Sequence, residues 1–191
     1  MNGNLPQKRS YALSPDRNIT LILEMLLLVA GGALAAMMHF KLRIPLNLPG
    51  HHGLEFMAIF VLIRLSANVR YAATLATLGT GIIILIPGMG ATNPLHSFSY
   101  LLPGLFLDFF YIIGRGRMHL LMIAGITAGI SYMMIPLSRL IVQIFIAFPY
   151  MAFVKFGVAY TVLCFLLFGM LGGILGYGLF IVKSVFNQNK N

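Results

Sequence analysis

The sequence predicts an all-α integral membrane protein, folded as a compact bundle of six transmembrane helices with both termini in the cytoplasm. Of its 191 residues, 59% are hydrophobic and only 9% are charged, and the mean hydropathy is +0.91. A soluble domain does not need apolar residues along its whole length. The net charge of +9 comes from basic residues that sit singly between apolar runs. This pattern is typical of membrane topology and anionic headgroups, and we expect no nucleic-acid binding.

Three segments are expected: a cytoplasmic N-terminal tail (residues 1–18), a six-helix membrane domain (residues 19–183) and a cytoplasmic C-terminal tail (residues 184–191). Basic residues ahead of the first apolar run, and Ala33-Leu34-Ala35 within it, leave a cleaved signal peptide as an alternative. The run continues to Phe40, about 33 Å as a helix, so we expect it to remain as a span. The lone Cys164 excludes an internal disulfide.

Polar and proline-containing breaks divide the apolar sequence. We expect helices at residues 19–40, 54–67, 71–86, 98–113, 119–135 and 157–182. Pro87 and Pro136 are expected to end the third and fifth of these helices, and Gly114 the fourth. Residues 140–154 are apolar but number only 15 and include Pro149. That length favours an interfacial or re-entrant segment, with a seventh span as the alternative.

The distribution of basic residues favours cytoplasmic termini. With six spans, nine Lys and Arg residues lie inside and four outside, whereas seven spans give eight against five. Both arrangements obey the positive-inside rule, so segment length decides more than charge does. The four outer residues are Lys41, Arg43, Arg139 and Lys155.

Polar residues concentrate at the predicted outer ends of the helices and in the outer loops. The positive-inside rule accounts for basic residues on the cytoplasmic side only, so those on the outer side need another explanation. We expect them to converge on an outward-facing pocket for a small molecule; the alternative is that they lie at the level of the lipid headgroups. The candidate residues are Lys41, Arg43, His51, His52, Glu55, Asn93, His96, Arg139 and Gln143.

A metal site in the same region is a weaker alternative. His52 and Glu55 are spaced so that both ligands can share one helical face, and His51 and His96 would complete a transition-metal site. No His-x-x-x-His or Cys-x-x-Cys pattern supports this arrangement. We therefore expect no metal and no cofactor.

Signatures of enzymes are absent from the sequence. It contains no Gly-x-Ser-x-Gly, no phosphate-binding Gly-x-x-x-x-Gly-Lys-Ser/Thr and no zinc-protease His-Glu-x-x-His. We expect a protein that is not an enzyme, with a membrane enzyme using His51, His52 and Glu55 as an alternative. Any active transport must take its energy from partners or from ion gradients.

Two charged residues fall inside predicted spans. Asp108 lies about two-thirds of the way along its helix, and Arg64 lies at a similar depth in another. A lone charge at the bilayer centre costs about 2.5–3.5 kcal/mol on insertion scales, so we expect the two to pair. A structural role is expected, with a proton or conformational relay as the alternative. Reversing both charges together should then restore folding that either single reversal abolishes.

Small residues four apart indicate close helix packing. Pairs of this kind in the last two helices, such as Gly169 with Gly173, are expected to pack inside the bundle. The first helix has two adjacent faces of small residues, Gly31 with Ala35 and Gly32 with Ala36. We expect one face to be buried internally and the other to be free for a partner subunit.

These features resemble the substrate-binding S components of energy-coupling factor (ECF) vitamin transporters. Such proteins carry an Ala-x-x-x-Ala-type docking motif in the first helix, where this chain has Gly31/Ala35 and Gly32/Ala36. The Pro-Gly-rich loop after that helix, and Tyr100-Leu101-Leu102-Pro103-Gly104 leading into Asp108, are also similar.

The resemblance implies a multi-pass subunit in the cytoplasmic membrane of a bacterium or archaeon. It would capture a micronutrient outside, topple in the bilayer, and release its substrate with a transmembrane T component and cytosolic ATPases as partners. The basic outer residues suggest an anionic substrate, and Phe98, Tyr100 and Tyr150 are candidates to stack on a ring. The alternative is a structural or assembly-type membrane protein without a small-molecule ligand.

Overall fold

The computed structural model describes residues 15–41, 47–86, 94–114, 120–146 and 149–188, and these fold into helices without any strand. Along the chain they form α1 (Pro15–Lys41), α2 (Gly53–Ser66), α3 (Ala72–Leu85), α4 (Pro94–Ser99), α5 (Leu102–Ile113), α6 (Leu121–Ile146), α7 (Met151–Phe156) and α8 (Val158–Gln188). The chain is therefore all-α, as the apolar runs predict.

Three of these helices are long and apolar enough to cross a membrane: Asn18–Met38 within α1, Leu121–Ile146 and Val158–Gln188. The helices α2, α3 and α5 have 14, 14 and 12 residues. At 1.5 Å per residue, each is about 21 Å long or less, shorter than the hydrocarbon core of about 30 Å. The six expected segments are therefore helical, but three of them are too short to span the bilayer alone.

The outer surface is apolar. Leu27, Met122 and Phe145 expose 72%, 74% and 82% of their surface, and many other large apolar side chains are similarly open. Monomeric soluble proteins rarely expose continuous apolar surface on this scale. Together with the three long helices, this surface supports an integral membrane protein.

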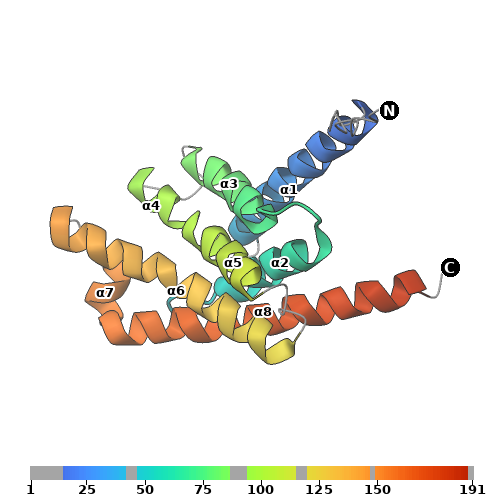
Figure 1. Cartoon of the computed structure of the whole chain (residues 1–191). Coiled ribbons are helices and arrows are strands. Elements are labelled where there is room, and N and C mark those ends of the chain that lie inside the picture. Colours follow the sequence, from blue (N-terminus) through green and yellow to red (C-terminus); the bar gives the residue numbers. More distant parts are fainter. Residues whose placement is uncertain (1–14, 42–46, 87–93, 115–119, 147–148, 189–191) are drawn as a thin grey trace, which may run out of the picture.

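The helices are arranged so that both described ends of the chain lie at one end of the molecule. In Figure 1, α1 begins and α8 finishes at the right, whereas α7 lies at the left. The long helices α6 and α8 pack against each other and are joined through α7; α2 packs on α8, α1 on α3, and α5 on both α3 and α6. Gly157, with φ of 82°, connects α7 to α8, a conformation that glycine adopts without steric cost.

The glycine pairs of α8 pack against two different helices. A Cβ at Gly169 or Gly173 would collide with the backbone of α6, and one at Gly172 or Gly176 would collide with the backbone of α2. Because lipid tails are as apolar as leucine, helices in a membrane associate through such close contact rather than by escape from water. The expectation that these pairs pack inside the bundle is confirmed.

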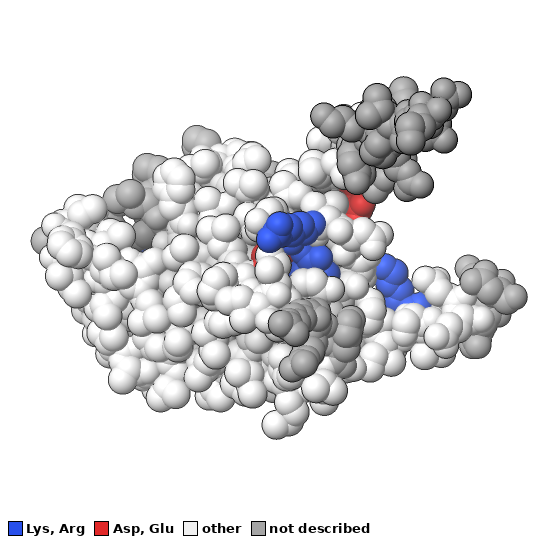
Figure 2. Space-filling view, in the orientation of Figure 1, with Lys and Arg blue, Asp and Glu red and all other residues white. Residues whose placement is uncertain are grey.

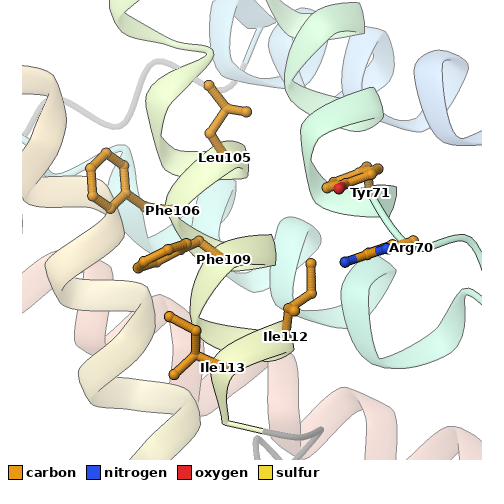
Figure 3. Close-up of a pocket in the computed structure, with 7 residues that line it drawn as sticks. All are labelled: Arg70, Tyr71, Leu105, Phe106, Phe109, Ile112 and Ile113. Carbon is orange, nitrogen blue, oxygen red and sulfur yellow. The ribbon is translucent and has the colours of Figure 1, made fainter.

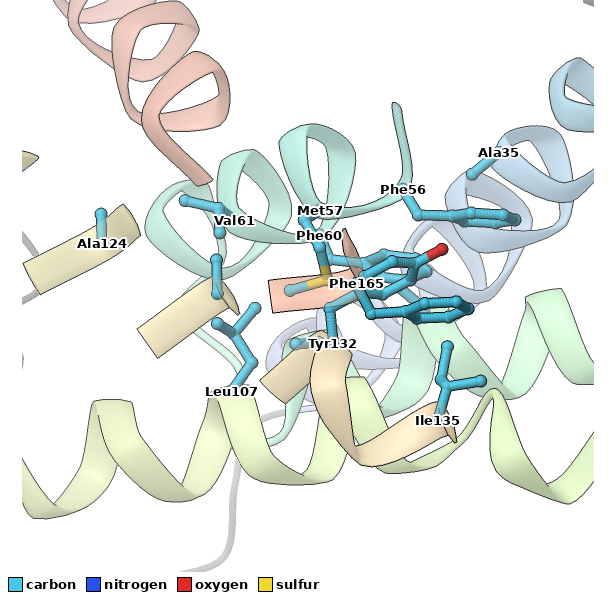
Figure 4. Packing of buried hydrophobic residues seen from close by; sticks show 13 residues of the cluster. Ala35, Phe56, Met57, Phe60, Val61, Leu107, Ala124, Tyr132, Ile135 and Phe165 are labelled. Atoms are coloured by element: carbon cyan, nitrogen blue, oxygen red, sulfur yellow. The ribbon is translucent and has the colours of Figure 1, made fainter. Parts of the chain in front are cut away.

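The core lies where α2 meets α5, α6 and α8. Met57 and Val61 of α2 and Leu107 of α5 are fully buried there. Figure 4 shows the rings of Tyr132 and Phe165 side by side in this cluster, with centroids 4.9 Å apart and planes inclined by 20°. Small residues bring the helices together, and these larger side chains fill the space between them.

The small residues of α1 do not form a free docking face, which corrects the expectation from the sequence. A Cβ at Gly32 would overlap the Ala76 carbonyl of α3, and Ala36 is fully buried. Ala35 is 3% exposed and belongs to the core, and Gly31 lies beside Ile63 of α2. Both faces are used inside the fold because α1 packs against α2 and α3 at once.

Helix α6 continues through Pro136 to Ile146, so the expectation that this proline ends the helix is wrong. A proline removes one backbone hydrogen bond, but packed neighbouring helices in a membrane protein tolerate this loss. Pro136 is fully buried, and α8 packs along α6. Residues 140–154 therefore do not form a helix of their own: residues 140–146 are the last turns of α6, and residues 151–154 are the start of α7.

The segment expected as one helix at residues 98–113 is instead divided between α4 and α5. Tyr100 and Leu101 form a turn between them, and Pro103 lies in the first turn of α5. Proline is accepted in the first turn of a helix because the N–H it lacks has no intrahelical partner there. The break therefore places Tyr100 at a turn rather than inside a helix.

Paired alanine substitutions test the packing of α1. Gly32→Ala should lower the free energy of unfolding by at least about 2 kcal/mol, because the new methyl group meets backbone that cannot rotate away. Gly31→Ala is the matched control, since its Cβ would lie 3.4 Å from the flexible Ile63 Cδ1 atom. Thermal unfolding in mild detergent, followed by circular dichroism, measures both. Equal stability of the two variants would contradict the packing described here.

Candidate functional site

Two groups of buried polar side chains stand out, one near each end of the bundle. The first is centred on Asp108 and Arg64, and we call it the Asp108 clamp. The second is centred on Arg139 near the α7 end, with Glu55, Tyr100, Tyr132 and Tyr150 around it, and we call it the Arg139 cluster. Charged side chains are rare in membrane interiors and mark either structural pairs or functional sites.

The Asp108 clamp contains the ion pair that the sequence analysis expected. Arg64 Nη1 lies 3.0 Å from Asp108 Oδ1, and the two side chains are 3% and 1% exposed. The Arg64 guanidinium also lies over the Tyr111 ring, 4.3 Å from its centroid. The pair neutralises both charges in a region where either one alone would be costly.

Asp108 also caps a helix to which it does not belong. Its Oδ2 atom accepts hydrogen bonds from the backbone N–H and the hydroxyl of Thr74, both at 2.7 Å, and its Oδ1 atom accepts one from the Ala73 N–H at 3.3 Å. These are the second and third residues of α3, whose own N-cap residue, Tyr71, makes no side-chain cap. N–H groups in the first turn have no intrahelical acceptor, so the carboxylate of α5 supplies one.

Arg64 completes the clamp from the other side of the turn between α2 and α3. Its Nη1 atom donates to the Arg70 carbonyl at 2.8 Å and its Nη2 atom to the Ala67 carbonyl at 3.3 Å. Asp108 therefore accepts hydrogen bonds from Arg64 and from the first turn of α3. Arg64 donates both to Asp108 and to the two backbone carbonyls. This arrangement supports the structural role. Because each side chain has its own backbone partners, the two residues cannot be swapped without losing hydrogen bonds.

The Arg139 cluster surrounds a buried cation with aromatic rings. The guanidinium carbon of Arg139 lies 4.6 Å from the ring centroid of Tyr150 and 5.4 Å from that of Tyr100, and the residue is 8% exposed. Its Nε atom has no hydrogen-bond partner within the described residues. Arg139 thus retains an unused donor in a site that excludes water.

Gln143 positions one of these rings. It lies one turn beyond Arg139 on α6, and its Oε1 atom accepts a hydrogen bond from the Tyr150 N–H at 3.3 Å. Burial raises the pKa of the Tyr150 phenol, and the nearby Arg139 charge opposes this. Because the phenol ionises only above its usual range, it stays protonated at neutral pH and can donate a hydrogen bond.

Glu55 lies in the first turn of α2, and the two adjacent histidines directly precede that helix. Glu55 is close enough to Tyr132 for an electrostatic interaction, as is Arg139. The rings of His51 and His52 lie 3.6 Å apart, and His51 Nδ1 is 2.6 Å from the Leu48 carbonyl oxygen. Two further atoms have no hydrogen-bond partner among the described residues, His51 Nε2 and Glu55 Oε2.

The structure thus brings Tyr100 and Arg139 together, with Gln143 as a support. Glu55 acts electrostatically on Tyr132, and His51 and His52 lie beside Glu55 at the start of α2. Arg43 and Asn93 lie outside the described residues, as do the side chains of Lys41 and His96. No group of three or more His, Cys, Asp or Glu residues in the described part of the chain is placed to hold a metal.

Sequence reasoning missed Tyr132, which lies under the cluster and stacks on Phe165. Tyr132 and Arg139 are seven residues apart, a spacing that places both on one helical face. That signal was available in the sequence, but it becomes visible only when the helix is allowed to continue through Pro136.

Comparisons of this chain with protein-family models, with curated proteins and with solved structures found no match. The resemblance to S components of ECF transporters therefore stays a prediction.

A charge-swap experiment tests the clamp. Either Asp108→Arg or Arg64→Asp alone should cost about 3–5 kcal/mol of stability, since each leaves a buried charge unpaired. The combined swap should not restore folding, because an arginine at position 108 cannot accept the N–H groups of Ala73 and Thr74. This reverses the rescue expected from the sequence. Expression and thermal stability in detergent are the measurements, and rescue by the double swap would show that only the ion pair matters.

Proposed function

We propose that this protein captures a small anionic molecule that contains a ring, at the outer face of a bacterial or archaeal cytoplasmic membrane, as the substrate-binding subunit of an ECF-type micronutrient transporter. The observation that carries the proposal is the Arg139 cluster. No carboxylate among the described residues lies within ion-pair distance of Arg139. A buried cation without a counter-ion is costly, and an anionic ligand would supply one.

The chemistry of the cluster fits such a ligand. Arg139 would pair with a carboxylate or phosphate, and the nearby rings of Tyr100 and Tyr150 would stack on a planar group. Glu55 and His51, each with an atom that lacks a described partner, would accept or donate hydrogen bonds to polar substituents. A mostly apolar site with a few convergent polar groups is typical of small-molecule recognition.

We propose six spans with cytoplasmic termini, an arrangement in which the Arg139 cluster would face outward. Both described ends of the chain lie at the end of the bundle opposite α7, as an even number of crossings requires (Figure 1). The basic side chains visible in Figure 2 lie from the centre of the molecule toward that end. By the positive-inside rule we assign this end to the cytoplasm, an orientation that would put Arg139 on the outer side. The short helices would complete their crossings with adjoining segments, α5 with α4 for example.

Release of the ligand would depend on a T component and cytosolic ATPases, because the sequence contains no nucleotide-binding motif. Contacts with these partners must use surfaces other than Gly32, Ala35 and Ala36, which are buried. The proposal therefore rests on the ligand site and the membrane topology rather than on a docking motif in α1.

A structural or assembly-type membrane protein is the second candidate, and one observation favours it. The described cavities lie along α5, near the turn between α2 and α3, and between α3 and α4, and none is lined by a residue of the Arg139 cluster. In that case Arg139 serves only to hold Tyr100 and Tyr150 in place, and no ligand copurifies with the protein.

Native mass spectrometry of the gently purified protein tests the ligand site. A small anionic molecule should remain bound, and Arg139→Gln should weaken its binding about 30-fold or more, the loss that follows when one partner of a buried charge pair is truncated. Lys155→Gln is the matched control, because Lys155 is an exposed cation close to the same end of the molecule. Absence of any retained molecule, or equal loss in both variants, would favour the structural candidate.

Single-cysteine labelling tests the topology. Val158 and Lys183 are 25 residues apart along α8, about 38 Å, so Lys155 and Lys183 should lie on opposite sides of the bilayer. In a Cys164→Ala background, an impermeant maleimide added to intact cells should label Lys155→Cys but not Lys183→Cys. Labelling of Lys183→Cys alone would show that the topology is inverted and that Arg139 lies on the cytoplasmic side.

A further inference from the structure

An open groove runs along the side of α5 that faces away from the core. It has a volume of about 570 Å³, and Figure 3 shows the side chains that form it. Its lining residues are Arg70, Tyr71, Leu105, Phe106, Phe109, Ile112 and Ile113. The groove lies between α5 and the beginning of α3, and none of its residues belongs to the Arg139 cluster.

The walls of the groove require an apolar occupant. Leu105, Phe109 and Ile113 are four residues apart, so they form one stripe along α5, and they expose 46%, 52% and 64% of their surface. A stripe of this kind binds hydrocarbon, and in a membrane the hydrocarbon available is an acyl chain. Three turns of apolar wall match a ligand that is long and unbranched.

One end of the groove is cationic. In Figure 3, Arg70 lies beside Ile112 near the end of α5, whereas Leu105 lies at the other end of the groove. The Arg70 guanidinium carbon is 5.5 Å from the Tyr71 ring centroid. Unlike Arg64, Arg70 forms no ion pair within the described residues. Its charge is therefore available to a ligand.

A second hollow of about 380 Å³ shares Arg70 and Ile112 with the groove and includes Arg64 and Asn68. No Asp or Glu residue lines either hollow. Arg64 is already paired with Asp108, so Arg70 is the cation that the polar end offers to a ligand, with the amide of Asn68 beside it. This is the complement of a phosphate group, whereas the apolar stripe is the complement of its acyl chain.

We propose that this groove binds an anionic phospholipid, with its phosphate at Arg70 and one acyl chain along Leu105, Phe109 and Ile113. Arg70 lies in the turn between α2 and α3, at the end of the bundle that carries both termini, so the lipid belongs to the leaflet on that side. The site requires only that the protein is embedded in a bilayer, so it stands whether or not the Arg139 cluster binds a substrate.

The chain contains no tryptophan, which makes a single-tryptophan reporter possible. The full-length F109W variant is reconstituted in vesicles of phosphatidylcholine that contain brominated phosphatidylglycerol or brominated phosphatidylcholine. Bromine on an acyl chain quenches tryptophan fluorescence on contact. Association of the anionic lipid should be about five-fold stronger than that of the neutral one, the ratio that corresponds to about 1 kcal/mol per basic residue at a membrane surface.

The ratio of anionic to neutral lipid association should fall to near unity in F109W/R70Q. The ratio should be unchanged in F109W/K183Q, because Lys183 is an exposed cation of α8 outside the groove. L167W places the reporter on the exposed face of α8 and should show no preference. If F109W fails to fold, L105W reports on the same groove. Equal quenching by the two lipids in the groove reporter, an unchanged preference without Arg70, or the same preference at position 167 would each overturn the proposal.

Discussion

Backbone-to-backbone approach is the constraint on which the rest of this structure depends. Inside a bilayer, apolar side chains gain nothing by leaving water, so helices must gain their attraction from close contact. The glycines of α8 meet α6 on one face and α2 on the other, and Gly32 and Gly79 bring α1 and α3 together in the same way. A side chain at any of these positions would separate two helices. The core residues of α2 fit only because these contacts hold their neighbours at the right distance.

The buried charged side chains that the structure describes lie in two groups, where helix packing leaves a backbone group or a charge that needs a partner. The Asp108 clamp satisfies the first turn of α3 and the carbonyls that follow α2. The Arg139 cluster differs, because Arg139 has no ion-pair partner among the described residues, whereas Arg64 is paired with Asp108. The charge of Arg64 is balanced inside the fold, and no described carboxylate balances that of Arg139. This difference is why we regard the second group, and not the first, as the candidate functional site.

Much of this could be predicted from the sequence. The apolar runs predict the helical class and, within a few residues, α1, α2, α3 and α8, since span length and breaking residues are local properties. The cost of a buried charge predicts the contact of Arg64 with Asp108. Features that depend on neighbours escaped prediction: the continuation of α6 through Pro136, and the packing of both small faces of α1 against other helices. No periodicity reveals how many neighbours a helix has.

The clamp also has a mechanical consequence. One carboxylate on α5 binds the start of α3, and its partner arginine binds the carbonyls at the end of α2, so three helices meet at a single point. The seam between α2 and α8 is lined by glycines. The clamp couples the position of α5 to the end of α2 and to the first turn of α3, so a displacement of α5 would strain both of the other helices at that point.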